Sequence, residues 1–206
     1  MKRILMVLAA ALGLACSTGE GEGEVKSDRL FIDDCWNGPF DLEPSFFGAE
    51  PAADSLIIRV QRGDNYEEVS DGLLVLIKDL DQIRETSLGG SLRVGLPPGV
   101  SPPGVPVVYD PNPPKVSLAL YLNATCHSQN GTIYAVDGNV SFESLFSGDP
   151  NEDDAEDRLT DASFDATFTD PRDIGPDGSY DGARASVVRG WFRSYFQRGQ
   201  PAQPFP

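Results

Sequence analysis

Apolar and polar residues alternate along much of the chain, a pattern typical of β-strands that bury one face. The clearest case is 116–122, where Val116, Leu118, Leu120 and Leu122 share one face. The same alternation predicts further strands at 30–32, 56–61, 92–96, 132–136, 140–142, 164–169 and 185–196. Gly, Pro, Asn and Asp separate these segments, as expected for turns.

Three other segments complete the pattern. The run Leu73–Ile77 is apolar throughout, which predicts a central strand buried on both faces. Residues 79–86 are compatible with one short helical turn. Residues 97–114 hold eight prolines, so we expect a surface loop there, with 105–109 as an edge strand.

Roughly nine short strands with little helix predict an all-β fold. The expected architecture is an antiparallel β-sandwich of two packed sheets. A jelly roll or a partly open barrel is the alternative.

The first fifteen residues have the pattern of a secretory signal peptide. Lys2 and Arg3 are positive, and Ile4–Leu14 follows without a charge. A membrane-spanning helix needs about 20 apolar residues, so this core is too short to be one. The sequence therefore predicts export and removal of residues 1–15.

Cys16 would then be the first mature residue. The sequence Gly13-Leu14-Ala15-Cys16 resembles the lipobox of bacterial lipoproteins, in which the cysteine sulfur receives a diacylglyceryl group. This resemblance to uncharacterised bacterial lipoproteins implies lipidation of Cys16. It also implies an outer-membrane location facing the periplasm or the cell surface, because Ser17 stands where an aspartate favours the inner membrane. Ordinary signal peptidase would accept the same residues, so Cys16 is either lipidated or merely the first mature residue.

The segment that follows Cys16 is rich in Gly, Glu and Ser. Such a composition buries little apolar surface and is typical of a flexible linker. We therefore expect residues 16–27 to be the lipidated cysteine and a flexible tether, and 28–206 to be a single β-domain.

The chain has three cysteines, an odd number for an exported protein. If Cys16 carries a lipid, Cys35 and Cys126 remain, and an oxidising compartment favours a disulfide between them. Two buried, reduced thiols are the alternative. The chain lacks the Cys-x-x-Cys spacing of redox motifs and cysteine zinc sites.

The chain is strongly acidic, with 16 Lys and Arg against 32 Asp and Glu and a net charge of −16. Removal of residues 1–15 takes away Lys2 and Arg3 and no acid, which leaves 14 against 32, or −18. This balance argues against nucleic acid and anionic lipid headgroups as partners.

The candidate chemistry of the loops is weak. Asp149, Asp153, Asp154 and Asp157 are candidates for calcium binding, and no other cofactor or metal is expected. An EF-hand loop that starts at Asp149 would need Gly in place of Asp154 and Glu at its twelfth position. Solvated acidic loops are the alternative. The chain has one histidine, His127, but no Gly-x-Ser-x-Gly elbow and no His-Glu-x-x-His motif, so no catalytic residue is predicted.

The last predicted strand has two different faces. Val188, Gly190, Phe192 and Phe196 suit a core. The opposite face carries the candidate ligand-binding residues, which are Arg189, Trp191, Arg193 and Tyr195. One interpretation is structural: the arginines pair with acids on neighbouring strands such as Asp165, and Trp191 lies across the pair. The other is binding of sugar rings or of an anionic polymer.

These features predict a non-enzymatic lipoprotein of the cell envelope with a structural or binding role. A carbohydrate- or polymer-binding β-sandwich is the alternative, and a secreted hydrolase is a further one. The expected partners are the membrane, through the lipid, and an envelope polysaccharide or protein. The sequence does not determine the oligomeric state.

Overall fold

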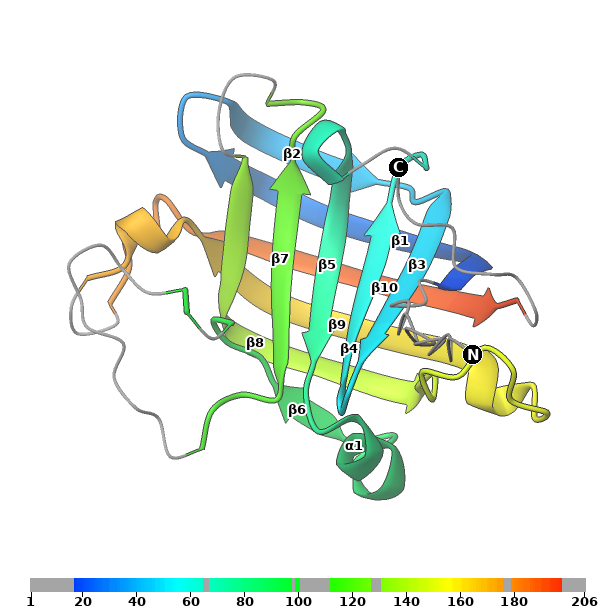
Figure 1. Ribbon diagram of the computed structural model, residues 1–206. Coiled ribbons are helices and arrows are strands. Elements are labelled where there is room, and N and C mark those ends of the chain that lie inside the picture. The colour runs from blue at the N-terminus through cyan, green and yellow to red at the C-terminus, as the bar shows by residue number, and fades with distance from the viewer. Residues whose placement is uncertain are drawn as a thin grey trace, which may run out of the picture.

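The computed structural model describes residues 17–64, 67–97, 99–100, 112–126, 131–175 and 179–197. These residues form one antiparallel sheet of ten strands with one short α-helix (Figure 1). The strands are β1 (Ser17–Ile32), β2 (Trp36–Leu42), β3 (Phe46–Ala52), β4 (Ser55–Gln61), β5 (Asp71–Ile77), β6 (Ser91–Arg93), β7 (Val116–Leu122), β8 (Thr132–Ser144), β9 (Leu159–Thr169) and β10 (Ser186–Phe196). The helices are α1 (Leu80–Thr86) and the 3₁₀ turns η1 (Glu67–Val69), η2 (Glu156–Arg158) and η3 (Pro171–Asp173).

Eight of the strands close into a barrel. Their order is β10-β9-β8-β7-β5-β4-β3-β1, and the pairing of β1 with β10 completes the ring. β2 extends the sheet beyond β1, and β6 pairs with β8. The prediction of an all-β fold is confirmed. The predicted sandwich of two separate sheets is not confirmed, because the strands form one closed barrel. The alternative prediction of a barrel is confirmed, but this barrel is closed and not partly open.

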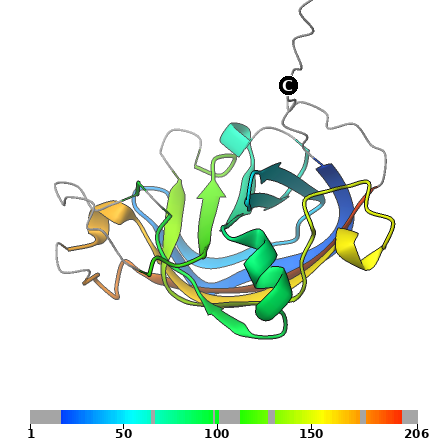
Figure 2. The same ribbon diagram turned by 60° about the horizontal axis from the view of Figure 1, so that its bottom comes forward.

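The barrel is flattened into two layers whose strands cross (Figure 1). The front layer consists of β3, β4, β5 and β7. The rear layer runs across behind it and consists of β9, β10, β1 and β2. Figure 2 shows α1 at one end of the barrel. No described segment covers the outer surface of the rear layer. That surface is therefore available for binding.

β8 makes a corner between the layers. Two strands separated by a turn at Asp137–Asn139 were expected, but β8 is continuous, with a bulge in its pairing with β9 between Ala135 and Asp137. Gly138 has a φ of 126° there. A Cβ on Gly138 would lie 2.4 Å from the Asp165 carbonyl oxygen, so the corner requires glycine.

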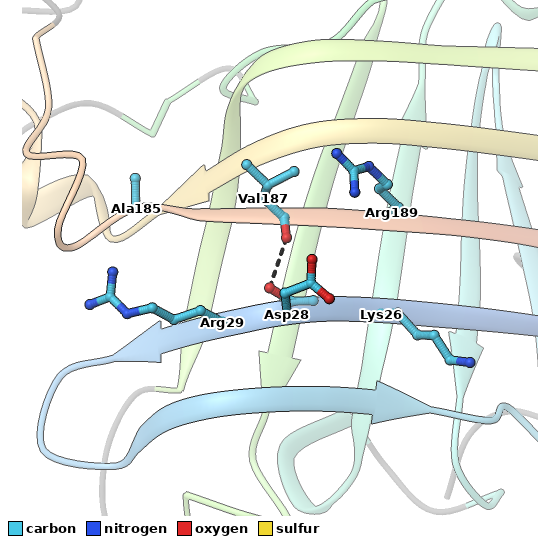
Figure 3. A pocket seen from close by; sticks show the side chains of 7 residues that line it. Lys26, Asp28, Arg29, Ala185, Val187 and Arg189 are labelled. Atoms are coloured by element: carbon cyan, nitrogen blue, oxygen red, sulfur yellow. Dashed lines mark hydrogen bonds between the residues drawn. The ribbon is translucent and has the colours of Figure 1, made fainter.

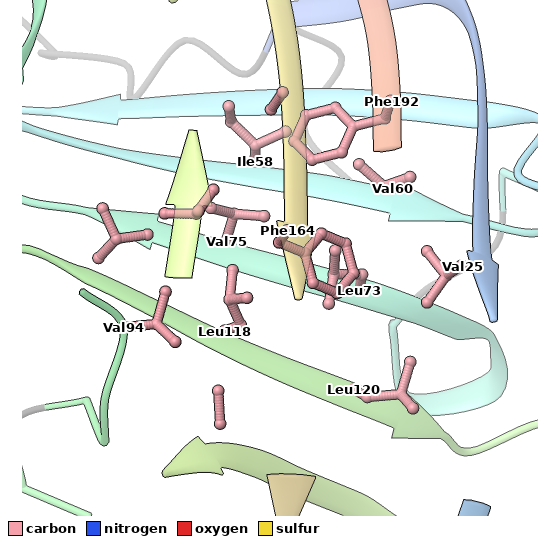
Figure 4. Close-up of a cluster of buried hydrophobic side chains, with 14 of the residues drawn as sticks. Val25, Ile58, Val60, Leu73, Val75, Val94, Leu118, Leu120, Phe164 and Phe192 are labelled. Atoms are coloured by element: carbon pink, nitrogen blue, oxygen red, sulfur yellow. The ribbon is translucent and has the colours of Figure 1, made fainter. Parts of the chain in front are cut away.

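Inward-pointing side chains of both layers fill the barrel (Figure 4). Phe164 and Phe192 of the rear layer lie among Ile58, Val60 and Leu73 of the front layer, and all five are buried. The barrel interior is thus a packed hydrophobic core. The prediction that β5 is buried on both faces was wrong, because Leu74 and Leu76 point outward and are partly exposed.

The predicted flexible tether is also wrong, because residues 17–27 belong to β1. The alternation of Gly and Glu is a strand pattern. Gly19 and Gly23 lie opposite the buried Phe196 and Phe192, and the glutamates between them point outward. The apolar bulk that these glycines lack comes from β10, so residues 17–27 are part of the folded domain.

Cys35 and Cys126 form the predicted disulfide, with a Cα–Cα distance of 5.7 Å. Cys35 lies in the turn between β1 and β2, and Cys126 follows β7. The bond therefore ties the β1–β2 hairpin to the front layer. None of the helices among the described residues is long and apolar enough to cross a lipid bilayer.

Candidate functional site

The outer side of β10 is the exposed stripe that its alternation predicted. Its members are Val187, Arg189, Trp191, Arg193 and Tyr195. Trp191 is 41% exposed and Tyr195 is 42% exposed, which is unusual for such large apolar side chains. At about 3.3 Å per residue, the two rings stand roughly 13 Å apart along the strand. They form a pair of aromatic platforms on the uncovered surface of the rear layer.

The two arginines of the stripe pair with acids of β9, as the structural interpretation predicted. The Arg189 Nε atom donates to the Asp165 carboxylate at 2.7 Å, and this hydrogen bond raises the pKa of Arg189. Arg193 Nε lies 3.6 Å from the Asp161 carboxylate. Among the described residues no guanidinium lies over the Trp191 ring, so that part of the structural interpretation does not hold. Within the described part of the chain, therefore, neither face of this ring has a cationic partner.

Acidic residues of β1 border the stripe on its other side. Glu20, Glu22 and Glu24 lie opposite Tyr195, Arg193 and Trp191. Glu20 accepts a hydrogen bond from the Gln197 amide at 2.7 Å. Glu24 forms an ion pair with Lys26 at 2.6 Å, and this contact raises the pKa of the Lys26 ammonium group. The aromatic platforms are therefore surrounded by charged side chains of both signs.

A hollow of about 390 Å³ continues the stripe between β1 and β10 (Figure 3). We call it the first hollow; its lining residues are Lys26, Ser27, Asp28, Arg29, Ala185, Val187 and Arg189. Figure 3 shows the Asp28 carboxylate over the space between the strands, with Arg29 on one side and Lys26 on the other. Three cations and one carboxylate thus meet at one depression.

These charged groups differ in how far they are already paired. Lys26 and Arg189 have acidic partners outside the hollow, and Arg29 donates to the Ala183 carbonyl oxygen at 2.6 Å and to the Asn37 side chain at 3.3 Å. Asp28 forms no ion pair within 4 Å among the described residues. Its carboxylate is therefore a free hydrogen-bond acceptor beside several N–H donors.

A second hollow of similar volume, about 390 Å³, lies on the other side of β1. It shares Lys26, Ser27 and Asp28 with the first hollow, and its remaining lining residues are Pro39, Phe40 and Asp41 of β2. Lys26 Nζ lies 3.6 Å from the Asp41 carboxylate across it. Each hollow thus combines apolar surface with carboxylate and ammonium groups.

The structure does not bring the calcium candidates together. Asp149 and Asp154 accept hydrogen bonds from backbone N–H groups of their own loop. Asp157 is ion-paired with Arg84. No group of three or more His, Cys, Asp or Glu residues suited to a metal ion occurs in the ranges that the structure describes.

Cys16, His127 and most of the proline-rich segment 97–114 lie outside the described residues. Calcium candidate Asp153 lies within them and is exposed on the surface.

Sequence reasoning missed the part of the site that β1 and β2 supply. Lys26 was assigned to the tether, Asp28 was the first residue of the predicted domain, and Phe40 lay in none of the predicted strands. The strict alternation of Gly and Glu through 19–24 was the available signal, because a period of two predicts a strand whatever its composition. The composition of the segment concealed that period.

No family model, no curated protein and no solved structure matches this chain.

Proposed function

We propose that this protein is a non-enzymatic envelope lipoprotein whose barrel binds a neutral polysaccharide on the outer face of β10 and β1. The observation that carries the proposal is the pair of half-exposed rings, Trp191 and Tyr195, beside a hollow with the free Asp28 carboxylate. Aromatic faces stack on the apolar faces of sugar rings, and charged groups of both signs hydrogen-bond with sugar hydroxyls.

The charge pattern favours a neutral ligand over an anionic polymer. Lys26, Arg189 and Arg193 are each neutralised by an acid within 4 Å. Glu20, Glu22 and Glu24 add negative charge along the same face. A polyanion would be repelled by these acids and by the net charge of −16. A hydroxyl group, in contrast, donates to a carboxylate and accepts from a guanidinium at the same time.

The anchoring part of the proposal is supported by the N-terminal sequence and by the cysteines. The disulfide uses Cys35 and Cys126, which leaves Cys16 as the third cysteine. Disulfides of this kind are typical of oxidising compartments such as the bacterial periplasm. A lipid on Cys16 would hold the barrel at a membrane surface, where envelope polysaccharide is within reach.

The test is retention of the full-length protein on insoluble neutral glucan, mannan and chitin, with polygalacturonate as the acidic comparison. Covering the exposed part of Trp191, 41% of roughly 250 Å², is worth about 2.5 kcal/mol at about 25 cal/mol per Å². Trp191→Ala should therefore weaken binding at least tenfold on a neutral polymer while the protein still folds. Binding should change little with salt, because the contacts are not between net charges.

Leu88→Ala is the matched control, because Leu88 is 42% exposed but lies next to α1, away from β10. It should bind like the unmodified protein. Equal binding by the Trp191→Ala variant, or binding to polygalacturonate alone that salt abolishes, would show that the proposal is incorrect.

A further inference from the structure

We propose that the two hollows beside β1 are adjoining subsites, so that the ligand is an oligosaccharide chain that crosses β1 from β10 to β2. This inference rests on the proposed function and adds to it the length and direction of the ligand.

The first hollow exists because β1 and β10 part there. Their backbone pairing runs from Gly19 to Lys26, which lies opposite Arg189. Beyond that point side chains replace the ladder: Ser27 Oγ donates to the Val187 carbonyl oxygen at 2.7 Å, and the Phe31 N–H donates to Ser186 Oγ at 2.8 Å. These bonds hold the strands apart at a fixed spacing, so the depression is a built part of the sheet.

The second hollow lies where the pairing of β1 with β2, on the other edge of β1, is irregular. The pairing of β1 with β2 shifts register between Ser27 and Leu30. A bulge twists the strand and re-aims its side chains. Asp28 lies within this bulge and lines both hollows, and its carboxylate is directed toward the first one (Figure 3).

The chemistry of the two hollows repeats. The first offers Val187 as apolar surface beside Asp28 and Arg29. The second offers Pro39 beside Asp28 and Asp41, and the half-buried Phe40, which packs against the core, also lines it. Each has a volume of about 390 Å³, within the range of about 300–1,000 Å³ for small-molecule sites. Two like sites that share a ridge suit a ligand made of repeating units, one unit to each hollow.

Trp191 gives the direction of the chain. It lies on β10 two residues beyond Arg189, which lines the first hollow, or about 6.6 Å along the strand. The path from the Trp191 platform to the first hollow therefore runs along β10, and the path from the first hollow to the second crosses β1. A single sugar would use one of these places, whereas a chain would use them together.

The test measures affinity for soluble oligosaccharides from monosaccharide to hexasaccharide, drawn from the glucan, mannan and chitin series. Trp36→Phe leaves Trp191 as the single tryptophan, so its fluorescence reports binding directly. Affinity should rise at least tenfold from the monosaccharide to the oligomers that reach both hollows. Asp28→Asn should weaken binding at every length above the monosaccharide.

Two variants address the second hollow. Phe40→Ala and Asp41→Asn should each remove most of the gain with chain length and leave the monosaccharide affinity unchanged. Asp41 has an exposed side chain, so its variant keeps the test decisive if loss of Phe40 disturbs folding. Val69→Ala, on an exposed residue of η1, is the control and should show the full gain.

The outcomes separate this inference from the proposed function. If oligosaccharides bind and Trp191→Ala weakens them, but affinity is independent of length or unaffected by both second-hollow variants, the two-subsite arrangement is wrong and the glycan-binding face stands. If no sugar of any length or class binds, the proposed function falls and this inference falls with it.

Discussion

Replacing Gly21 by alanine tests whether the Gly-Glu segment is part of the barrel wall. Gly21 lies on β1 opposite Ser194 of β10. A Cβ on Gly21 would lie 2.4 Å from the Arg193 carbonyl oxygen and 2.7 Å from the Ser194 Cβ atom. Ordinary contacts between such atoms are about 3.5 Å or longer, so the two strands would have to separate by about 1 Å.

The cost follows from that separation. Overpacking of a well-packed site costs about 1–3 kcal/mol, and each ladder hydrogen bond that lengthens forfeits up to about 1 kcal/mol more. We expect Gly21→Ala to lower the free energy of unfolding by about 2–4 kcal/mol. For a domain of this size, that corresponds to a Tm lower by about 5–15 °C.

Gly38→Ala is the matched control. Gly38 also lies in a strand, β2, but a Cβ there would meet no atom within 4 Å. This substitution should be neutral or stabilise the fold by up to about 1 kcal/mol, because alanine restricts the unfolded chain. Urea and thermal unfolding, followed by circular dichroism, would measure both variants. If Gly21→Ala unfolds within about 0.5 kcal/mol of the unmodified protein, residues 17–24 do not close the barrel and the tether interpretation is restored.

Three further predictions concern other parts of the molecule. Replacing both Cys35 and Cys126 by serine should lower the free energy of unfolding by up to about 4–5 kcal/mol, because the bond closes a loop of 91 residues; equal urea midpoints for oxidised and variant protein would contradict this. Tyr121→Phe should cost about 1–2 kcal/mol in thermal unfolding, since the buried Tyr121 hydroxyl donates to Gln61 Oε1 at 2.8 Å, and an unchanged Tm would count against it. Mass spectrometry of the mature N-terminus should find a diacylglyceryl group on Cys16, and an unmodified cysteine or a different first residue would rule out the lipid anchor.

Strands with strict alternation were predictable from sequence because one buried face imposes a period of two. The two faces of β10 were found for this reason. The strand 116–122 was also found, but its second face was expected to be open, whereas every residue of β7 is buried. The pairing of Cys35 with Cys126 followed from cysteine arithmetic. Barrel closure was not predictable, since it depends on which strands become neighbours, and alternation along one strand carries no information about that.

The candidate site was predictable only in its β10 half. Arg189 and Trp191 stood out because cations between aromatic residues are unusual in an acidic chain. Asp28 did not stand out, because it is one of 32 acids and its importance comes from the bulge in β1 and the parting of β1 from β10. Such irregularities in pairing arise between strands and leave little trace in the sequence of either one.

The seam between the first and the last strand also determines when the protein can fold. Glu20 and Gln197, hydrogen-bonded across that seam, are 177 residues apart. Pairing over such a separation costs a large loss of chain entropy, because a long loop must close. Proteins dominated by non-local pairings therefore fold slowly. During synthesis β1 precedes the other strands and has no β10 to pair with until all the strands between them have been made. Until then the glycine-rich edge of β1 that faces β10 stays unpaired, so the nascent chain becomes compact slowly. An unpaired strand edge also promotes aggregation, so the chain needs protection until β10 has been made.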